Sequence, residues 1–106
     1  MLNITVFVKN DDYIGIRSEG HAQFDEPGKD IVCAAVSVLM INTLNSIESF
    51  TEDDFEGGED DGFLEFMLNG EISDASKLLL KSLVLGLTSI QETYGNAYLE
   101  ITTKEV

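Results

Sequence analysis

Two long apolar segments of helical pattern, residues 31–50 and 74–93, occupy more than a third of this 106-residue chain. Their apolar residues cover most of the helical circumference instead of a single stripe, a pattern typical of helices that are buried on more than one side. In so short a chain the available cover is a sheet, the other helix or a partner subunit. We therefore expect one domain, residues 1–106, in which the remaining segments supply the strands.

Strand-like patterns occur in the segments outside these helices. Residues 2–9 and 13–20 alternate apolar and polar side chains on either side of a polar turn, which predicts a hairpin. Residues 62–69 and 97–103 predict two further strands. The predicted fold is α+β in the order β-β-α-β-α-β, a four-stranded mixed sheet with two helices packed on one face. Whether the last two strands are parallel neighbours or are separated is left open by the sequence.

The chain is strongly acidic, with twenty Asp and Glu residues against six Lys and Arg residues and a net charge of −14. A phosphate backbone would be repelled by such a surface, so we expect no direct binding of nucleic acid. A cationic partner such as a Lys- and Arg-rich protein tail would be attracted, although acidic surfaces also simply keep proteins soluble. Residues 51–62 carry seven carboxylates between Glu52 and Asp61 and predict an exposed loop, to which the sequence assigns no function.

No apolar run approaches the ~20 residues of a membrane span, and the first residues lack the basic start of a secretory signal. The lone cysteine rules out an intramolecular disulfide. We therefore expect a cytoplasmic protein with no membrane partner.

Cys33, the only cysteine, lies in the first turn of the first predicted helix. Unpaired backbone N–H groups and the positive end of the helix dipole favour a thiolate there, and a thiolate is a nucleophile. The small residues Ala34 and Ala35 allow another backbone to come close. The alternative is an inert buried thiol, because free cysteine is among the most buried residue types.

His21, the only histidine, lies on the loop just before this helix, where it would take a proton from Cys33 and pass it to a departing amine. The alternative is a solvated loop histidine with no task. Two ligands are too few for a structural zinc site, and the acidic stretch does not fit the EF-hand pattern. We expect no metal and no cofactor.

Four further residues are candidates for supporting roles around this pair. Asp30 is predicted to cap the helix and also has the option of orienting His21. Ser37 lies one turn after Cys33 on the same face. Gly20 and Gly28 bracket the loop as candidate hinges of a flap over the thiol. Free N–H groups at the helix start, including that of Cys33, are candidate donors to an oxyanion.

The blocks GHA (residues 20–22) and GKDIVCAAVS (residues 28–37), on a chain of this length and predicted order, closely resemble the ribosomal-processing cysteine protease family, often called Prp. The resemblance implies that Cys33 is the nucleophile and His21 its base. It also implies removal of a short N-terminal extension from a large-subunit ribosomal protein, by a homodimer with a flexible loop over its active site.

The resulting hypothesis is a cytoplasmic cysteine endopeptidase whose substrate is the basic N-terminal extension of a ribosomal protein. The charge supports it, because an enzyme of net charge −14 should capture a basic protein quickly at low salt. The rival from another class is a non-enzymatic acidic module that binds a ribosomal protein during ribosome assembly, with Cys33 merely packed.

Overall fold

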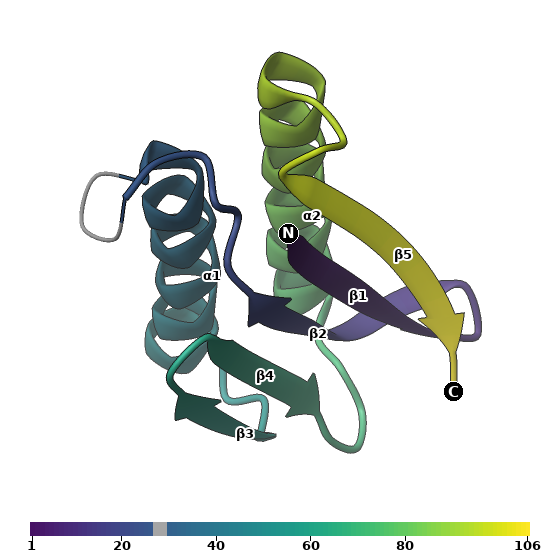
Figure 1. Cartoon of the computed structure of the whole chain (residues 1–106). Coiled ribbons are helices and arrows are strands. Elements are labelled where there is room, and N and C mark those ends of the chain that lie inside the picture. Colours follow the sequence, from purple (N-terminus) through teal and green to yellow (C-terminus); the bar gives the residue numbers. More distant parts are fainter. Residues whose placement is uncertain (27–29) are drawn as a thin grey trace.

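The structure, a computed structural model, describes residues 1–26 and 30–106 (Figure 1). Five strands and two helices follow one another as β1 (Leu2–Lys9), β2 (Asp12–Gly20), α1 (Ile31–Phe50), β3 (Phe55–Asp60), β4 (Phe63–Leu68), α2 (Asp74–Tyr94) and β5 (Leu99–Glu105). The predicted α+β class is confirmed.

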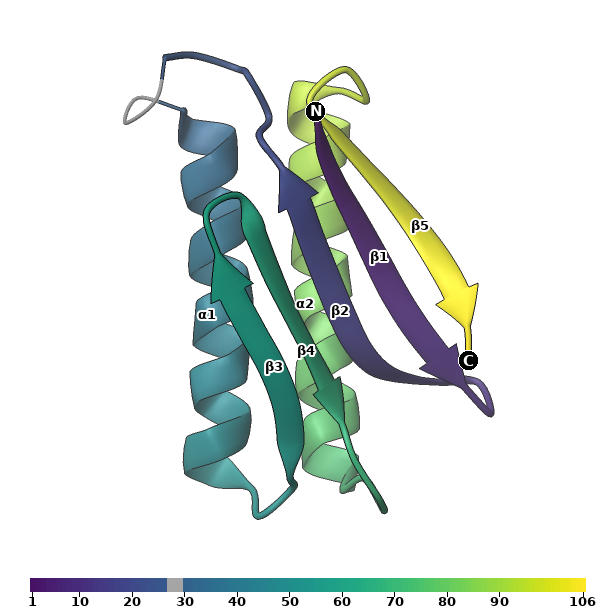
Figure 2. The same ribbon diagram turned by 60° about the horizontal axis from the view of Figure 1, so that its bottom comes forward.

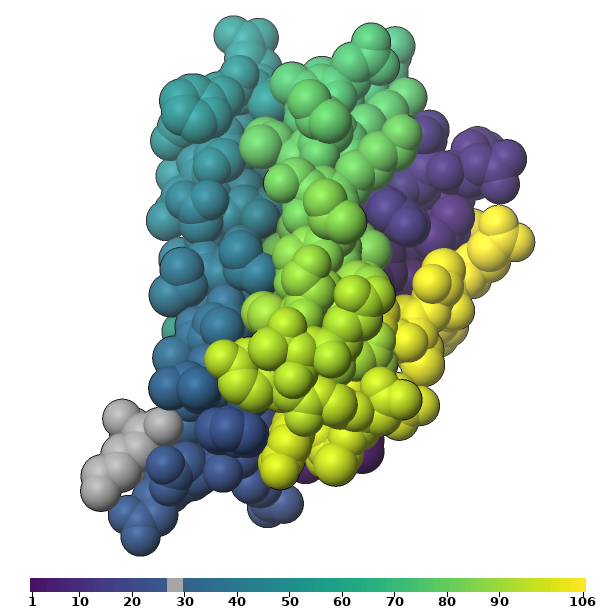
Figure 3. Space-filling view, turned by 90° about the horizontal axis from the view of Figure 1, so that it is seen from above, coloured from purple at the N-terminus to yellow at the C-terminus, as the bar shows by residue number. Residues whose placement is uncertain are grey.

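The strands form one mixed sheet in the order β3-β4-β2-β1-β5. All pairings are antiparallel except that of β5, which runs parallel to β1. The last two predicted strands, β4 and β5, are therefore separated by β2 and β1. Both helices lie on the same face of the sheet, as Figure 2 shows. They lie side by side and hide most of that face, while β5 and the β1–β2 turn extend beyond them (Figure 3).

The hairpin β1–β2 forms where the alternation predicts it. Leu2, Ile4 and Val6 point into the core below the helices, and each is at most 5% exposed. Asn10 and Asp11 connect the strands, both with positive φ, which are the backbone angles of a two-residue type I′ turn. This hairpin ends at Gly20 and so delivers His21 to one end of the sheet.

The predicted exposed loop at residues 51–62 is wrong over residues 55–60, which form β3, and the sheet has five strands instead of four. β3 is an edge strand whose side chains are all exposed except the half-buried Phe55. A strand with no buried face has no reason to alternate, so periodicity could not reveal it. The available signal is the dipeptide Asp61-Gly62, a common two-residue hairpin connection, which joins β3 to β4.

Helix α1 buries one stripe of its surface, and a list of its buried residues shows helical spacing: Val32, Val36, Met40, Thr43 and Ile47. The chain itself does not cover the rest of the apolar circumference, since Val38 is 66% exposed. The expectation that no apolar run approaches the length of a membrane span is contradicted by α1, which has 20 residues, a mean hydropathy of 1.6 and thus the length and composition of such a span. Its buried stripe nevertheless packs in the core, and core helices of folded domains commonly have this length and hydropathy.

Helix α2 begins at the N-cap Ser73, whose hydroxyl accepts a hydrogen bond from the N–H of Ser76. The same hydroxyl donates to Asp53 at 2.7 Å, and the N–H of Ser73 donates to the same carboxylate at 3.1 Å. These bonds lower the pKa of Asp53, the Ser73 hydroxyl being the largest cause. They join the segment between α1 and β3 to the start of α2, and so fix where the chain passes from α1 into the β3–β4 hairpin.

Candidate active site

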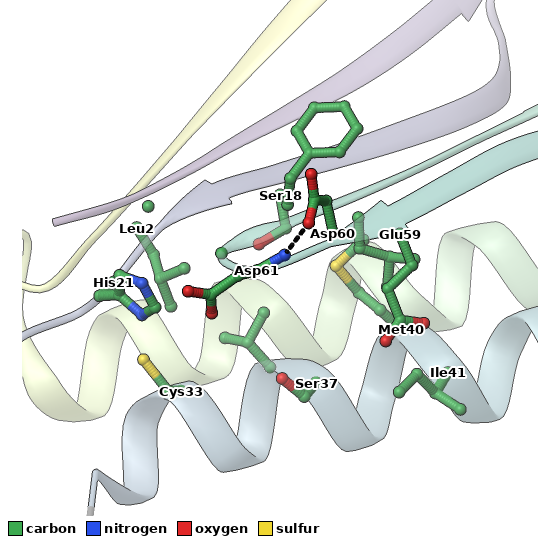
Figure 4. Close-up of a pocket in the computed structure, with 15 residues that line it drawn as sticks. Leu2, Ser18, His21, Cys33, Ser37, Met40, Ile41, Glu59, Asp60 and Asp61 are labelled. Atoms are coloured by element: carbon green, nitrogen blue, oxygen red, sulfur yellow. Dashed lines mark hydrogen bonds between the residues drawn. The ribbon is translucent and has the colours of Figure 1, made fainter. Parts of the chain in front are cut away.

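His21 and Cys33 meet at one end of the sheet. His21 follows the last residue of β2, and Cys33 lies in the first turn of α1 with its sulfur turned toward the imidazole (Figure 4). Both residues, together with Ser37, line two cavities of about 520 and about 670 Å³. The structure therefore brings together the only imidazole and the only thiol of the chain. His21 is exposed and Cys33 is half-buried, so a substrate has access to both.

Asp30 is the N-cap of α1, as predicted. Its Oδ1 accepts hydrogen bonds from the N–H groups of Val32 and Cys33, both at 3.0 Å, and its Oδ2 accepts from the N–H of Phe24 at 3.1 Å. Burial opposes ionisation of Asp30, but the hydrogen bonds from Cys33, Phe24 and Val32 together outweigh it and hold the pKa of the carboxyl below its ordinary value. Asp30 is thus an ionised cap that also binds the loop.

The expected thiolate at Cys33 is not what these surroundings favour in the resting protein. Burial raises the pKa of the Cys33 thiol above its ordinary value, and the Asp30 carboxylate raises it further, while the N–H of Ala22 acts in the opposite direction. Burial is the largest cause of the raised pKa. The cap adds to it, because the N–H groups of Val32 and Cys33 that would have stabilised a thiolate already bind Asp30. The thiol consequently needs a base at the moment it reacts.

The same cap corrects a second expectation, that the N–H of Cys33 is a free donor for an oxyanion. That N–H donates to Asp30 Oδ1 at 3.0 Å. The N–H that does point at the sulfur belongs to Ala22, which donates to Cys33 Sγ at 3.2 Å. Sequence reasoning missed this group, because a main-chain donor leaves no mark in the residue types.

Gly62 sets the space available to the imidazole. It lies in the β3–β4 turn with φ +69°, and a Cβ built on it would lie 3.0 Å from Nε2 of His21. The turn is tied to the end of β2 by a hydrogen bond from the N–H of Gly20 to the carbonyl of Gly62, at 2.8 Å. The absence of a side chain at Gly62 therefore lets the ring pack against the turn. The Asp61-Gly62 dipeptide was the signal that sequence reasoning passed over.

The two predicted hinges have different outcomes. Gly20 has φ +91°, and a Cβ there would lie 2.5 Å from the carbonyl oxygen of Met1, so this position requires glycine whether or not it moves. Gly28 lies outside the described residues. Asp30 makes its bonds to backbone N–H groups, and the structure gives no hydrogen bond between it and His21 within the described part of the chain.

The described part of the loop is anchored at Phe24. Its ring makes edge-on contacts with Tyr94 and Tyr98, with centroids 5.3 and 5.0 Å apart, at the end of α2. Its N–H is held by Asp30, as above. Between these two attachments and β2, Ala22 is 1% exposed and belongs to the core. The backbone next to the thiol is therefore held on three sides.

Acidic side chains border the smaller cavity. Glu59, Asp60 and Asp61, at the tip of the β3–β4 hairpin, line it together with Cys33 and His21. In Figure 4 the Asp61 carboxylate points into the cavity on the side of His21. The acidic segment to which the sequence assigned no function thus reaches the candidate active site. In residues 1–26 and 30–106, no group of three or more His, Cys, Asp or Glu side chains is placed to hold a metal ion.

Comparison with known proteins agrees with this geometry. The family model described as "Cysteine protease Prp" matches residues 1–99. The chain belongs to this family. The ribosomal processing cysteine protease Prp of Bacillus subtilis is 31% identical over 90 residues, which cover 79% of this chain and 80% of that protein. The Prp of Staphylococcus aureus is 26% identical over 98 residues, covering 90% and 92% of the two chains.

Solved Prp structures have the same fold over nearly the whole chain. The crystal structure of the S. aureus protease with a covalently linked product peptide superposes with a TM-score of 0.92, at 26% identity over 98% of this chain and 100% of that one. The S. aureus structure with a substrate peptide gives 0.86 at 25% identity, with the same coverage. This chain is accordingly a cysteine protease of the Prp family, and the rival interpretation as a non-enzymatic module is not supported.

Proposed function

We propose that Cys33 is the nucleophile and His21 the general base of this protease. The single observation that carries the proposal is their convergence on shared cavities, with the sulfur turned toward the ring. His21 takes the proton of the thiol as sulfur attacks the scissile carbonyl, then gives it to the departing amine. Water releases the acyl-enzyme. Because the pKa of Cys33 is raised, the base must act during attack.

A relative's structure holds a product peptide in a covalent linkage, which supports covalent catalysis by this chain as well. Asp30 has a supporting role in this scheme: it holds the first turn of α1 and the loop at Phe24, and so places the sulfur. Ser37 lines both cavities and is available to bind substrate.

The proposed substrate is the basic N-terminal extension of a large-subunit ribosomal protein. Glu59, Asp60 and Asp61 support it, because they place three carboxylates at the rim of the cavity that holds Cys33. Together with the net charge of −14, they would attract Lys and Arg residues of such an extension and speed its capture at low salt. The relatives are named ribosomal processing proteases, and this supports a ribosomal substrate.

We also propose a homodimer located in the cytoplasm. Apolar side chains on the outer faces of the two helices support the dimer: Val38, Leu78 and Leu85 are each 66–69% exposed. Sedimentation equilibrium of the wild type and of Leu85→Glu tests it. A dimer that becomes monomeric in the variant is expected, and a wild-type monomer at micromolar concentration would contradict it.

The test of the function is incubation with a panel of ribosomal proteins that carry N-terminal extensions, followed by mass spectrometry of the products. We expect one cut within a basic extension by the wild type and none by Cys33→Ala or Cys33→Ser, with unchanged circular dichroism. His21→Ala should lower the rate by about 10²–10⁴-fold. Cutting by Cys33→Ala at nearly the wild-type rate would end the proposal.

A further inference from the structure

We propose that the main-chain N–H of Ala22 is the oxyanion donor of this protease, an inference that rests on Cys33 being the nucleophile as proposed above. The N–H of Ala22 already points at the sulfur, because it donates a hydrogen bond to Cys33 Sγ at 3.2 Å. In the tetrahedral intermediate the oxyanion is bonded to the carbon that sulfur has attacked, two bonds away from Sγ. A donor so close to sulfur is within hydrogen-bonding reach of that oxygen.

A second observation is the poor partner that this N–H has at rest. Ala22 is 1% exposed, and a buried N–H normally binds a good acceptor such as a carbonyl oxygen. Here the acceptor is sulfur, which is a weak one. When the oxyanion forms, the same N–H exchanges a weak acceptor for a charged one. That gain arises in the transition state and not in the resting enzyme, which is the condition for lowering the barrier.

Other N–H groups near the sulfur, at the start of α1, already have hydrogen-bond acceptors. The N–H groups of Val32 and Cys33 at the start of α1 both bind Asp30 Oδ1 at 3.0 Å. The Ala34 N–H donates to the carbonyl of Asp30 at 3.1 Å. The first two donors would have to leave an ionised carboxylate, and the third a main-chain carbonyl, before they could bind an oxyanion. The N–H of Ala22 needs no such rearrangement.

The neighbours of Ala22 keep its N–H in place. On one side the N–H of Gly20 binds the carbonyl of Gly62 at 2.8 Å, and on the other the N–H of Phe24 binds Asp30. Between them, the Ala22 side chain is packed in the core and Gln23 turns the backbone with φ +59°. Donors fixed in advance cost no reorganisation during the reaction.

The thiol proton passes to His21, a sulfur electron pair forms the S–C bond, and the carbonyl π pair moves onto oxygen, where the Ala22 N–H binds it. Collapse restores the carbonyl and expels the amine, which takes the proton from His21. The N–H thus stabilises the negative charge without exchanging a proton.

The test replaces this one N–H by an ester oxygen. The whole chain is made by chemical synthesis and joined at Val32–Cys33, with lactic acid in place of Ala22. The control carries the hydroxy-acid analogue of Lys77, which loses the bond from its N–H to the carbonyl of Ser73, 3.1 Å long and far from the site. We expect the Ala22 ester to lower kcat by about 10²–10³-fold with little change in KM, and the Lys77 ester to leave both within about threefold.

The pH dependence separates oxyanion binding from an effect on the thiol, because the N–H of Ala22 also lowers the pKa of Cys33. The kcat loss should persist at high pH, where the thiol is ionised in both proteins. Recovery of the wild-type kcat there would overturn the proposal, as would a loss of less than about threefold at all pH values. Inactivity of Cys33 itself would be seen separately, as cutting by Cys33→Ala, and would refute the proposed function instead.

Nuclear magnetic resonance of the natural chain is an independent measurement if the ester protein fails to fold. Labelling with ¹⁵N-alanine marks only five amides, those of Ala22, Ala34, Ala35, Ala75 and Ala97. A peptide aldehyde that adds to Cys33 should move the Ala22 amide proton downfield by more than the other four. An adduct that forms, as seen by mass, while the Ala22 amide stays in place would overturn the proposal.

Discussion

Replacing Gly62 by alanine tests whether the β3–β4 turn holds the imidazole of His21, the proposed base, in position. At φ +69° an L-residue is destabilised by about 1–2 kcal/mol, so the melting temperature should fall by roughly 5–10 °C. The new Cβ would also lie 3.0 Å from Nε2 of His21, and the ring must retreat by a few tenths of an ångström. Since a displacement of 1 Å near the chemistry costs up to about 10²-fold, we expect kcat to fall about tenfold with KM nearly unchanged.

Gly70 provides a matched control. It also has φ +69°, but a Cβ there meets nothing within 4 Å. Gly70→Ala should therefore lose about the same stability as Gly62→Ala while its kcat stays at the wild-type value. The assay is steady-state cleavage of the extended ribosomal protein at a temperature well below both melting transitions. Equal kcat values for the two variants would refute the idea that Gly62 positions His21.

Three further predictions concern charges around the site and the fold. Asp30→Asn keeps an oxygen for the helix cap but removes a charge that raises the pKa of Cys33. The pH midpoint for alkylation of Cys33 by iodoacetamide should therefore be lower than in the wild type, and an unchanged midpoint would contradict this. Converting Asp60 and Asp61 together to asparagine should raise KM for a basic extension at low salt and make KM depend less on salt concentration. An unchanged salt dependence of KM would show that the hairpin tip does not take part in substrate capture. Asp53→Ala should cost about 1 kcal/mol near pH 7 through the lost bonds to Ser73. Because the pKa of Asp53 is lowered in the folded state, the difference in free energy of unfolding between variant and wild type should vanish as the pH falls below about 3.9 and through the folded pKa. A difference that persists in acid would contradict the role given to Asp53.

The sequence predicted those parts of the fold that bury an apolar face. β1, β2 and both helices carry periodic apolar residues, because one side of each packs in the core. β3 escaped prediction because its pairing with β4 uses main-chain groups and leaves its side chains in solvent. Which apolar residues of the helices face outward, as Leu85 does, could not be predicted, because composition alone does not say which face is covered.

The site was predictable to the extent that it is local in sequence. Cys33 follows its cap by three residues, so its place in the first turn of α1 could be inferred from Asp30 alone. The raised pKa of the thiol could not be predicted, because it depends first on how deeply the sulfur is buried and then on which N–H groups the Asp30 carboxylate already binds. The contact of His21 with Gly62 depends on the register of β2 against β4, which no local pattern encodes.

The central claim is that one sulfur atom performs the cleavage, and trapping the acyl-enzyme tests it most directly. The basic extension is mixed with the protein, quenched in acid within milliseconds and digested for tandem mass spectrometry. The account predicts the N-terminal fragment of the substrate attached to Cys33 and accumulating in His21→Ala more slowly than in wild type. Efficient cleavage with the acyl group on any other residue, or with Cys33 replaced by alanine, would contradict it.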